Sequence, residues 1–187
     1  TLEDNLARYF PREIAETKAR IAALESDIHT RDTHPAPADS FVGIELDGIC
    51  YTERVAAGEA LLNLLPTVQD TKPVHVGSFR GFDVEASLEQ FGKHVLTLKG
   101  SSEHHVELGS DALGNVMRVE NALTGMDKQL EKSRARLEDL ERQTENARAE
   151  LEKPFPQEAE LAEKSARLIE LNAELDIESK APSEPVS

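Results

Sequence analysis

The chain has 187 residues and a mass of 20.6 kDa, which suits one small domain with helical extensions. Its formal net charge of -15, from 36 acidic and 21 basic side chains, argues against the extensive basic face of a nucleic-acid-binding protein. No apolar run approaches the ~20 residues of a membrane span, and the amino terminus lacks the pattern of a signal peptide, so we expect a cytoplasmic protein.

Residues 1–31 predict helices that pair with a long helical arm further along the chain. A short helix is expected over residues 1–9 and a longer one over residues 12–31, with Pro11 suited to a first helical turn. The stretch 31–40 then carries two prolines and few apolar residues, which is typical of a linker. The apolar stripe of the longer helix contains Ile14, Ile21, Leu24 and Ile28.

Residues 40–110 predict a small α+β domain, because the apolar period changes to two and short breaks separate the runs. Asp47-Gly48 is a strong hairpin signal, and the other short breaks favour antiparallel pairing. Thr52 is suited to cap a helix that ends near Leu65 and covers one face of the sheet. About six strands are expected, over residues 41–46, 49–51, 74–79, 82–88, 95–99 and 103–108.

Residues 111–177 predict a long helix, a turn and a return helix. A seven-residue apolar repeat from Val116 to Leu151 lies in one uninterrupted helical stretch and indicates a coiled-coil arm. The prolines of the KPFP sequence at 153–156 end that helix, and a third helix over 158–177 follows. The expected seam of the arm consists of Val116, Val119, Leu123, Met126, Leu130, Leu137, Leu140, Leu151, Leu161, Leu168 and Leu175.

The predicted fold class is therefore α+β, with a small antiparallel β-sheet domain and one helix set on a long antiparallel helical coiled-coil arm. The first helices are expected along the proximal half of the arm, and the return helix along its distal half. Residues 178–187 are polar and contain proline, so we expect a mobile tail.

No catalytic signature is present in the sequence. It lacks a phosphate-binding loop, a dinucleotide-binding glycine pattern, a zinc-protease helix, a paired-cysteine motif and a nucleophile elbow. We therefore expect no catalytic residue, no cofactor and no metal in this segment. Phe79, Arg80 and Phe82 lie at a strand break, where an arginine between two aromatic rings is typical of stacking contacts, and they form a possible recognition surface.

Four histidines and one cysteine lie in the strand region and leave one alternative open. His75, His94, His104 and His105 could converge on a metal ion, because His105 shares one strand face with acidic neighbours. Ordinary surface histidines would produce the same pattern. Cys50 is expected to be a small, buried or half-buried strand residue.

The chain resembles a known family over nearly its whole length, in the runs TLEDNLARYFPREIAE, DGICYTERVAAGEALL, HHVELGSDALGNVMRVENAL and KPFPQEAELAEKSARLIELNAEL. These runs are similar to the carboxy-terminal region of very large helicase and N-6 adenine DNA methylase proteins, with Swi/Snf-type DEAD/DEAH helicases, on conjugative elements, plasmids and phages of bacteria. The resemblance implies ATP-driven DNA remodelling and S-adenosylmethionine-dependent methylation by upstream domains. No motif of either activity lies in these residues, so the resemblance assigns no catalytic residue here.

The sequence thus favours a non-catalytic accessory module that positions a DNA-processing motor on DNA or on a partner. Because the chain starts at Thr1 without an initiator Met, we expect a piece of a longer protein. Its expected partners are the upstream helicase and methylase domains, DNA through the parent chain, and no membrane. A stand-alone coiled-coil adaptor that forms a homodimer through the arm is the alternative, and a small metal-dependent enzyme is the third hypothesis.

Overall fold

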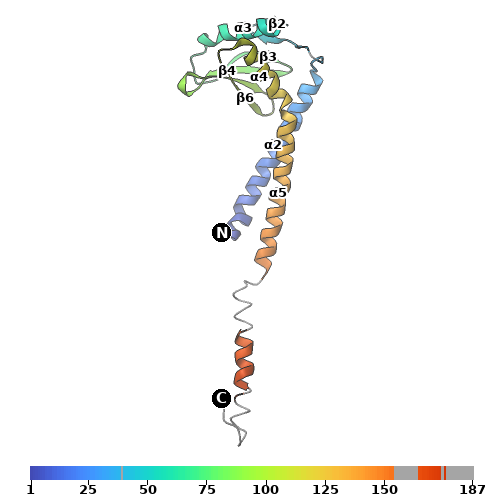
Figure 1. Cartoon of the computed structure of the whole chain (residues 1–187), viewed down its shortest axis with the longest axis vertical. Helices are drawn as coiled ribbons and strands as arrows, with labels where there is room; N and C mark the ends of the chain where they lie inside the picture. The colour runs from blue at the N-terminus through green and yellow to red at the C-terminus, as the bar shows by residue number, and fades with distance from the viewer. Residues whose placement is uncertain (39, 154–163, 174, 176–187) are drawn as a thin grey trace, which may run out of the picture. The chain divides into compact units, whose positions relative to one another are not determined.

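The computed structural model describes residues 1–38, 40–153, 164–173 and 175. The chain divides into two compact units, one of Pro11–Glu141 and one of Thr1–Phe10 with Arg142–Ser187. The elements are α1 (Leu2–Asp4), the π-helix η1 (Asn5–Tyr9), α2 (Phe10–Thr33), β1 (Ile44–Leu46), β2 (Ile49–Tyr51), α3 (Arg54–Leu64), the 3-10 helix η2 (Leu65–Thr67), β3 (Val74–Phe79), β4 (Phe82–Leu88), the 3-10 helix η3 (Gln90–Gly92), β5 (His94–Lys99), β6 (Glu103–Glu107), α4 (Ala112–Thr124) and α5 (Met126–Glu152) (Figure 1).

The fold class is a mixture of helices and one antiparallel sheet, as the sequence predicts. The six strands lie in the order β2-β1-β3-β4-β5-β6, and every neighbouring pair is antiparallel. The β1–β2 turn has positive φ at both Asp47 (51°) and Gly48 (81°), as a type I′ turn requires. Arg80 (47°) and Gly81 (83°) repeat that pattern between β3 and β4.

One face of the sheet is covered by helices and holds the hydrophobic core. Helix α3 lies over the sheet (Figure 1) and approaches α4 closely, because Gly58 has no side chain to collide with the backbone of Ala112. The cap of α3 is Glu53 rather than the expected Thr52. Buried core residues on the strands and helices include Leu24, Leu46, Leu61, Phe82, Val84, Ala86, Leu96, Leu98, Val106, Val116, Val119 and Leu123.

The amino-terminal helices are not separated as the sequence analysis expected. Residues 2–33 are helical throughout, although Pro11 lies near the start of α2. Proline has no N–H to donate, and the turn before it is widened to a π-helix in which the Phe10 N–H donates to the Asn5 carbonyl. The widened turn lets the helical path continue past the proline.

The predicted single helix from residue 111 to residue 153 is also corrected, since it is divided into α4 and α5 at Gly125. The backbone there has φ -72° and ψ -9°, and the Gly125 N–H is shared between the carbonyls of Asn121 and Leu123. Glycine is a weak helix former, so the helix is interrupted at the residue that stabilises it least.

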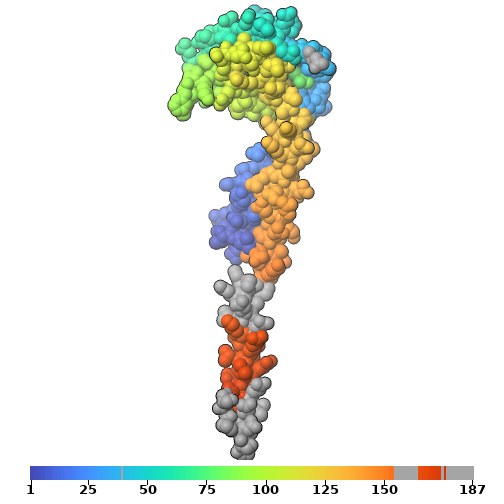
Figure 2. Space-filling model, in the orientation of Figure 1, coloured from blue at the N-terminus to red at the C-terminus, as the bar shows by residue number. Residues whose placement is uncertain are grey.

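Helix α2 runs antiparallel to α5 within the Pro11–Glu141 unit. Arg31 Nη1 lies 2.7 Å from Asp127 Oδ2, and Arg134 Nη2 lies 3.0 Å from Glu25 Oε1, so residues ascend along one helix as they descend along the other. Figure 2 shows the two helices in contact as solid surfaces. Arg31 also donates from Nη1 to the Leu123 carbonyl at 2.9 Å, which ties α2 to the end of α4.

The seam residues have different environments along the arm. Val116, Val119, Leu123, Met126, Leu130 and Leu140 are buried, and Leu137 is half-buried. Leu151 (40%), Leu168 (58%) and Leu175 (40%) are exposed. Residues 164–173 are helical, while Leu161, the KPFP turn from residue 154 onward and the tail from residue 178 lie outside the described residues. Within the described parts, no helix is long and apolar enough to cross a membrane.

Candidate functional site

The open edge of the sheet at β6 is the candidate functional site. In the β5–β6 ladder, the Leu108 N–H donates to the His94 carbonyl, and the Gly100 N–H donates to the Ser102 carbonyl. Since paired residues bond at every second position, the even-numbered residues of β6 face β5. The backbone groups of Glu103, His105 and Glu107 therefore point away from the sheet.

The first end of β6 is held by Asp27 of α2. The Asp27 carboxylate is fully buried (0% exposed) and accepts the backbone N–H groups of Ser101 at 2.6 Å and Ser102 at 3.1 Å. It also accepts the Ser102 hydroxyl at 2.7 Å and lies 2.7 Å from His104 Nε2. Four hydrogen bonds thus fix the β5–β6 turn to the helix.

These contacts determine the ionisation of Asp27. Burial by itself raises the pKa of the carboxyl, but the hydrogen bonds from His104, from the Ser102 hydroxyl and from the two backbone N–H groups together outweigh it. The pKa of Asp27 is consequently lower than its usual value. The carboxylate is therefore a stable anion in the core, compensated by donors rather than by water.

The second end of β6 is held by Asn115 of α4. Its side chain is 0% exposed, accepts the Gly109 N–H on Oδ1 at 2.8 Å, and donates from Nδ2 to the Gly109 carbonyl at 2.9 Å. This pair of bonds satisfies both backbone groups of the residue at which the chain leaves the sheet. The edge strand is thus fixed at both ends by buried polar side chains.

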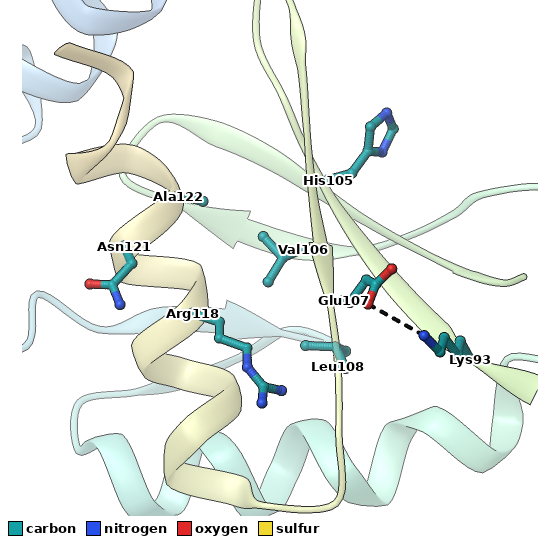
Figure 3. A pocket seen from close by; sticks show the side chains of 8 residues that line it. All are labelled: Lys93, His105, Val106, Glu107, Leu108, Arg118, Asn121 and Ala122. Atoms are coloured by element: carbon teal, nitrogen blue, oxygen red, sulfur yellow. Dashed lines mark ion pairs between the residues drawn. The ribbon is translucent and has the colours of Figure 1, made fainter. Parts of the chain in front are cut away.

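A hollow of about 630 Å³ lies between β6 and α4 (Figure 3). Val106, Leu108 and Ala122 supply apolar wall, and Arg118 and Asn121 supply polar groups from α4. On the strand side, Lys93 Nζ lies 3.7 Å from Glu107 Oε2, drawn as a dashed line in Figure 3. The open edge therefore has a partly apolar recess beside it.

Comparisons with protein-family models, with curated proteins and with solved structures give no match for this chain. The resemblance to helicase-methylase proteins remains an interpretation of the sequence. The geometry around β6 supplies a separate basis for a functional proposal.

The Asp27, Ser102 and His104 side chains contain the groups of a nucleophilic triad but not its geometry. His104 Nε2 lies 2.7 Å from the Asp27 carboxylate and 3.3 Å from the Ser102 hydroxyl, so a single ring nitrogen contacts both. In a working triad the acid and the nucleophile contact opposite nitrogens of the ring. The Ser102 hydroxyl also donates to Asp27, so the cluster is built to hold the turn.

Phe79, Arg80 and Phe82 do not form the predicted recognition surface. Phe79 and Phe82 are buried in the core, where their rings cannot stack on a ligand. Arg80 donates from Nε to the His34 carbonyl at 2.8 Å and from Nη2 to the Arg31 carbonyl at 3.1 Å. It therefore caps the end of α2, and burial, reinforced by the positive charge of Arg31, lowers its pKa.

The four histidines of the metal hypothesis lie in separate environments. His104 faces Asp27, and His94 Nε2 lies 3.1 Å from the Val68 carbonyl. His105 Nδ1 lies 3.1 Å from the Thr97 hydroxyl, and His75 is exposed on β3. Among the described residues, no three His, Cys, Asp or Glu side chains are placed to hold a metal ion. Cys50 is exposed on β2, in contrast to the expected burial.

Asp27 and Asn115, the two side chains that fix the edge strand, are not among the functional residues that the sequence predicts. Asp27 stands next to Ile28 and three residues after Leu24, on the buried side of α2. An acidic residue within an apolar stripe is a recognisable signal of a buried polar contact. The sequence could not show that its partners lie more than seventy residues away, at the β5–β6 turn.

Proposed function

We propose that the chain is a non-catalytic accessory module at the carboxy-terminal end of a large DNA helicase and adenine methylase of a mobile genetic element. It positions the motor on DNA or on a partner protein. ATP and S-adenosylmethionine then belong to the parent chain, and this segment contributes binding surfaces only.

The observation that carries this proposal is the preorganised edge of β6. Asp27 and Asn115 are buried polar side chains that act on backbone groups at the two ends of one exposed strand. Holding a strand edge in one geometry lowers the ordering cost of binding. Buried polar side chains that hold an exposed strand in place are what an interaction module needs. The resemblance to helicase-methylase proteins implies the enzyme to which the module belongs.

A coiled-coil arm is the second part of the proposal. The antiparallel contacts of α2 with α5 at Glu25 and Arg31 support helix pairing near the sheet. The regular repeat of apolar residues toward Leu151 supports its continuation as a coiled coil. Such an arm would separate the β6 edge from the motor by a defined distance.

The test is to find the polypeptide to which these residues belong. Lysate of the source organism is probed with an antibody raised against this chain, and the captured protein is sequenced by mass spectrometry. We expect a band far above 20.6 kDa and peptides from helicase and methylase domains in the same polypeptide. A band near 20.6 kDa that contains no such peptides would overturn the proposal.

One observation favours the alternative of a stand-alone coiled-coil adaptor that dimerises through its arm. Leu151 is 40% exposed in the arm, and Leu168 and Leu171 are exposed at 58% and 54%. Exposed apolar side chains at helical spacing are typical of a helix that packs against another helix in a complex. Sedimentation equilibrium checks this alternative: a mass that doubles with concentration, and that stays monomeric in Leu151→Glu, would support it.

A further inference from the structure

We infer that β6 binds an extended segment of another protein, which adds to the sheet as a seventh strand and carries basic side chains opposite Glu103 and Glu107. This inference names the partner class of the interaction module and rests on that proposed function for its biological setting only. It follows from the backbone of β6, from the charges on its outer face and from the hollow beside it.

The backbone groups of β6 specify a strand as the occupant. Glu103, His105 and Glu107 direct their N–H and C=O groups away from β5, and an extended chain satisfies such an alternating row completely. The contacts at Ser101, Ser102 and Gly109 hold this row in place before any partner arrives. Strand addition thus costs little ordering on the side of this protein.

The exposed side chains of β6 specify the charge of the occupant. Glu103 and Glu107 lie on the outer face of the sheet, with His105 between them. Glu107 lies 3.7 Å from Lys93 Nζ and Glu103 lies 3.8 Å from His105 Nε2, but these are surface contacts that leave both carboxylates exposed to a partner. Directly opposite residues on neighbouring strands interact, and opposite charges stabilise the pair. An antiparallel partner therefore fits best with Lys or Arg at two positions four residues apart.

The same charges argue against a second copy of this chain. An antiparallel pairing of two β6 strands centred on His105 would set Glu103 of one copy opposite Glu107 of the other. Two such carboxylate pairs would repel, because like charges directly opposite each other destabilise a sheet. The charge pattern of the edge thus selects a different, basic strand.

The hollow specifies one further side chain. A partner residue opposite Val106 points to the helix-covered side of the sheet, because side chains alternate along a strand. It would enter the recess of about 630 Å³, in contact with the apolar wall of Val106, Leu108 and Ala122 and with Arg118 and Asn121 on the α4 side. An apolar side chain next to the first basic residue fits that recess, so the recognised pattern is basic, apolar, any, any, basic.

The experiment titrates the full-length ¹⁵N-labelled chain with the synthetic peptide acetyl-Gly-Lys-Val-Thr-Val-Lys-Gly-amide. We expect amide shifts to change at 103–108 of the β6 edge and at 118–122 of α4, with slower hydrogen exchange at His105. The same peptide methylated on the central threonine nitrogen cannot donate to the His105 carbonyl. It is expected to bind at least about ten-fold more weakly, because it loses a backbone hydrogen bond and fits the edge poorly.

Charge variants test the sign of the partner. Glu103→Lys and Glu107→Lys should each lower the affinity for the lysine peptide by about two- to five-fold. Each should raise the affinity for a peptide that has Glu in place of both Lys residues. Glu59→Lys makes the same change of charge on the exposed side of α3 and serves as the matched control. It is expected to leave both affinities within error.

Three outcomes would overturn the inference. Shift changes that lie elsewhere, or none at millimolar peptide, would remove the β6 site. Equal binding of the methylated peptide would remove strand addition. Protection of His105 that rises with protein concentration in the absence of peptide would instead identify a second copy as the occupant. None of these outcomes changes the mass on the immunoblot, so the accessory-module proposal stands or falls separately.

Discussion

At the scale of single residues, the buried Asp27 carboxylate is the group on which the β6 edge most depends. It accepts four hydrogen bonds in a site without exposure to solvent. An amide in its place offers one acceptor oxygen, and its NH₂ group faces donors. Removing one partner from a buried charged cluster leaves the others unsatisfied, which is a large cost.

The first prediction is therefore that Asp27→Asn lowers the free energy of unfolding by about 2–4 kcal/mol. Urea denaturation followed by far-UV circular dichroism measures the change. Asp83→Asn, at an exposed site on β4, is the matched control and should change the free energy by less than about 0.5 kcal/mol. A loss at Asp27 no larger than at Asp83 would contradict the structural role of the cluster.

The second prediction concerns the pH dependence of the same group. The pKa of Asp27 is lower in the folded state than the usual 3.8, so the folded state favours the ionised carboxyl. Its stabilising contribution is complete above the unfolded-state pKa and is lost as the pH falls through the folded-state pKa. The difference in unfolding free energy between the natural chain and Asp27→Asn should thus be constant near pH 5 to 6 and shrink below about pH 4. A difference that grows on acidification would show that the folded-state pKa is raised.

Arg31 has a comparable role where α2 meets the α4–α5 junction. Its guanidinium donates to both oxygens of Asp127 and to the Leu123 carbonyl, and the hydrogen bond to Asp127 raises the pKa of Arg31 and lowers that of Asp127. The ammonium group of a lysine cannot donate to two carboxylate oxygens and a carbonyl in the planar geometry of the guanidinium.

The third prediction is that Arg31→Lys lowers the free energy of unfolding by about 1–2 kcal/mol, measured by thermal denaturation. Arg12→Lys provides the comparison, because Arg12 is exposed and lies 3.9 Å from Glu16. It should be neutral within error. Equal effects at the two positions would mean that the Arg31 contacts are no better than a surface ion pair.

At the scale of elements, two glycines in helical surroundings have opposite roles. Gly58 allows α3 to approach α4, and a Cβ there would overlap the backbone carbonyl of Ala112. Gly125 separates α4 from α5, and a Cβ there would lie 3.1 Å from the Asn121 carbonyl oxygen. Glycine is needed for packing at the first position, whereas at the second a Cβ would make a tight contact that a shift of a few tenths of an ångström relieves.

The fourth prediction uses this contrast. Gly58→Ala should lower the free energy of unfolding by about 1–3 kcal/mol, because the overlap with α4 exceeds the gain of ~1 kcal/mol in helix propensity. Gly125→Ala should raise it by about 0.5–1 kcal/mol and join the two helices. Chemical denaturation of both variants gives the comparison. Stabilisation by both alanines would show that α3 and α4 are not in close contact.

At the scale of the whole molecule, the hydrophobic core extends beyond the sequence interval that contains the strands. Leu24 of α2 and Val116 and Leu123 of α4 belong to the same buried cluster as the strand residues. One of the two compact units is Pro11–Glu141, and it includes residues on both sides of positions 40 and 110. Helices that precede and follow the strands in the sequence thus complete the hydrophobic core of the sheet.

The fifth prediction is that residues 11–141 fold as an independent unit with one cooperative thermal transition, whereas residues 40–110 alone do not. The shorter piece keeps α3 but lacks Asp27, Asn115 and the core residues of α2, α4 and α5, and small domains need most of their apolar surface buried. Near-ultraviolet circular dichroism and amide dispersion in NMR spectra distinguish the two. A folded 40–110 fragment would contradict the shared core.

The sequence by itself determined the local structure. The six strands followed from the alternation of apolar residues, and their antiparallel pairing followed from the short breaks with glycine at hairpin positions. Both signals are local, because the side-chain period and the φ preference act over a few residues. The helices within residues 2–153 also followed, although the prediction of separate first helices and of one unbroken long helix was wrong. A single proline or glycine shifts helix stability by an amount that neighbouring contacts can reverse.

Only the tertiary structure decided the candidate site. The roles of Asp27, Asn115 and Arg31 depend on groups distant in the chain, and Phe79 and Phe82 look alike in sequence whether they are buried or exposed. Local patterns specify which surface of an element is apolar, but long-range hydrogen bonds and burial depend on which elements meet. The packing of α2 and α4 against the sheet placed two buried polar side chains at the ends of β6. Among the described residues, the outer backbone groups of β6 have no neighbouring strand.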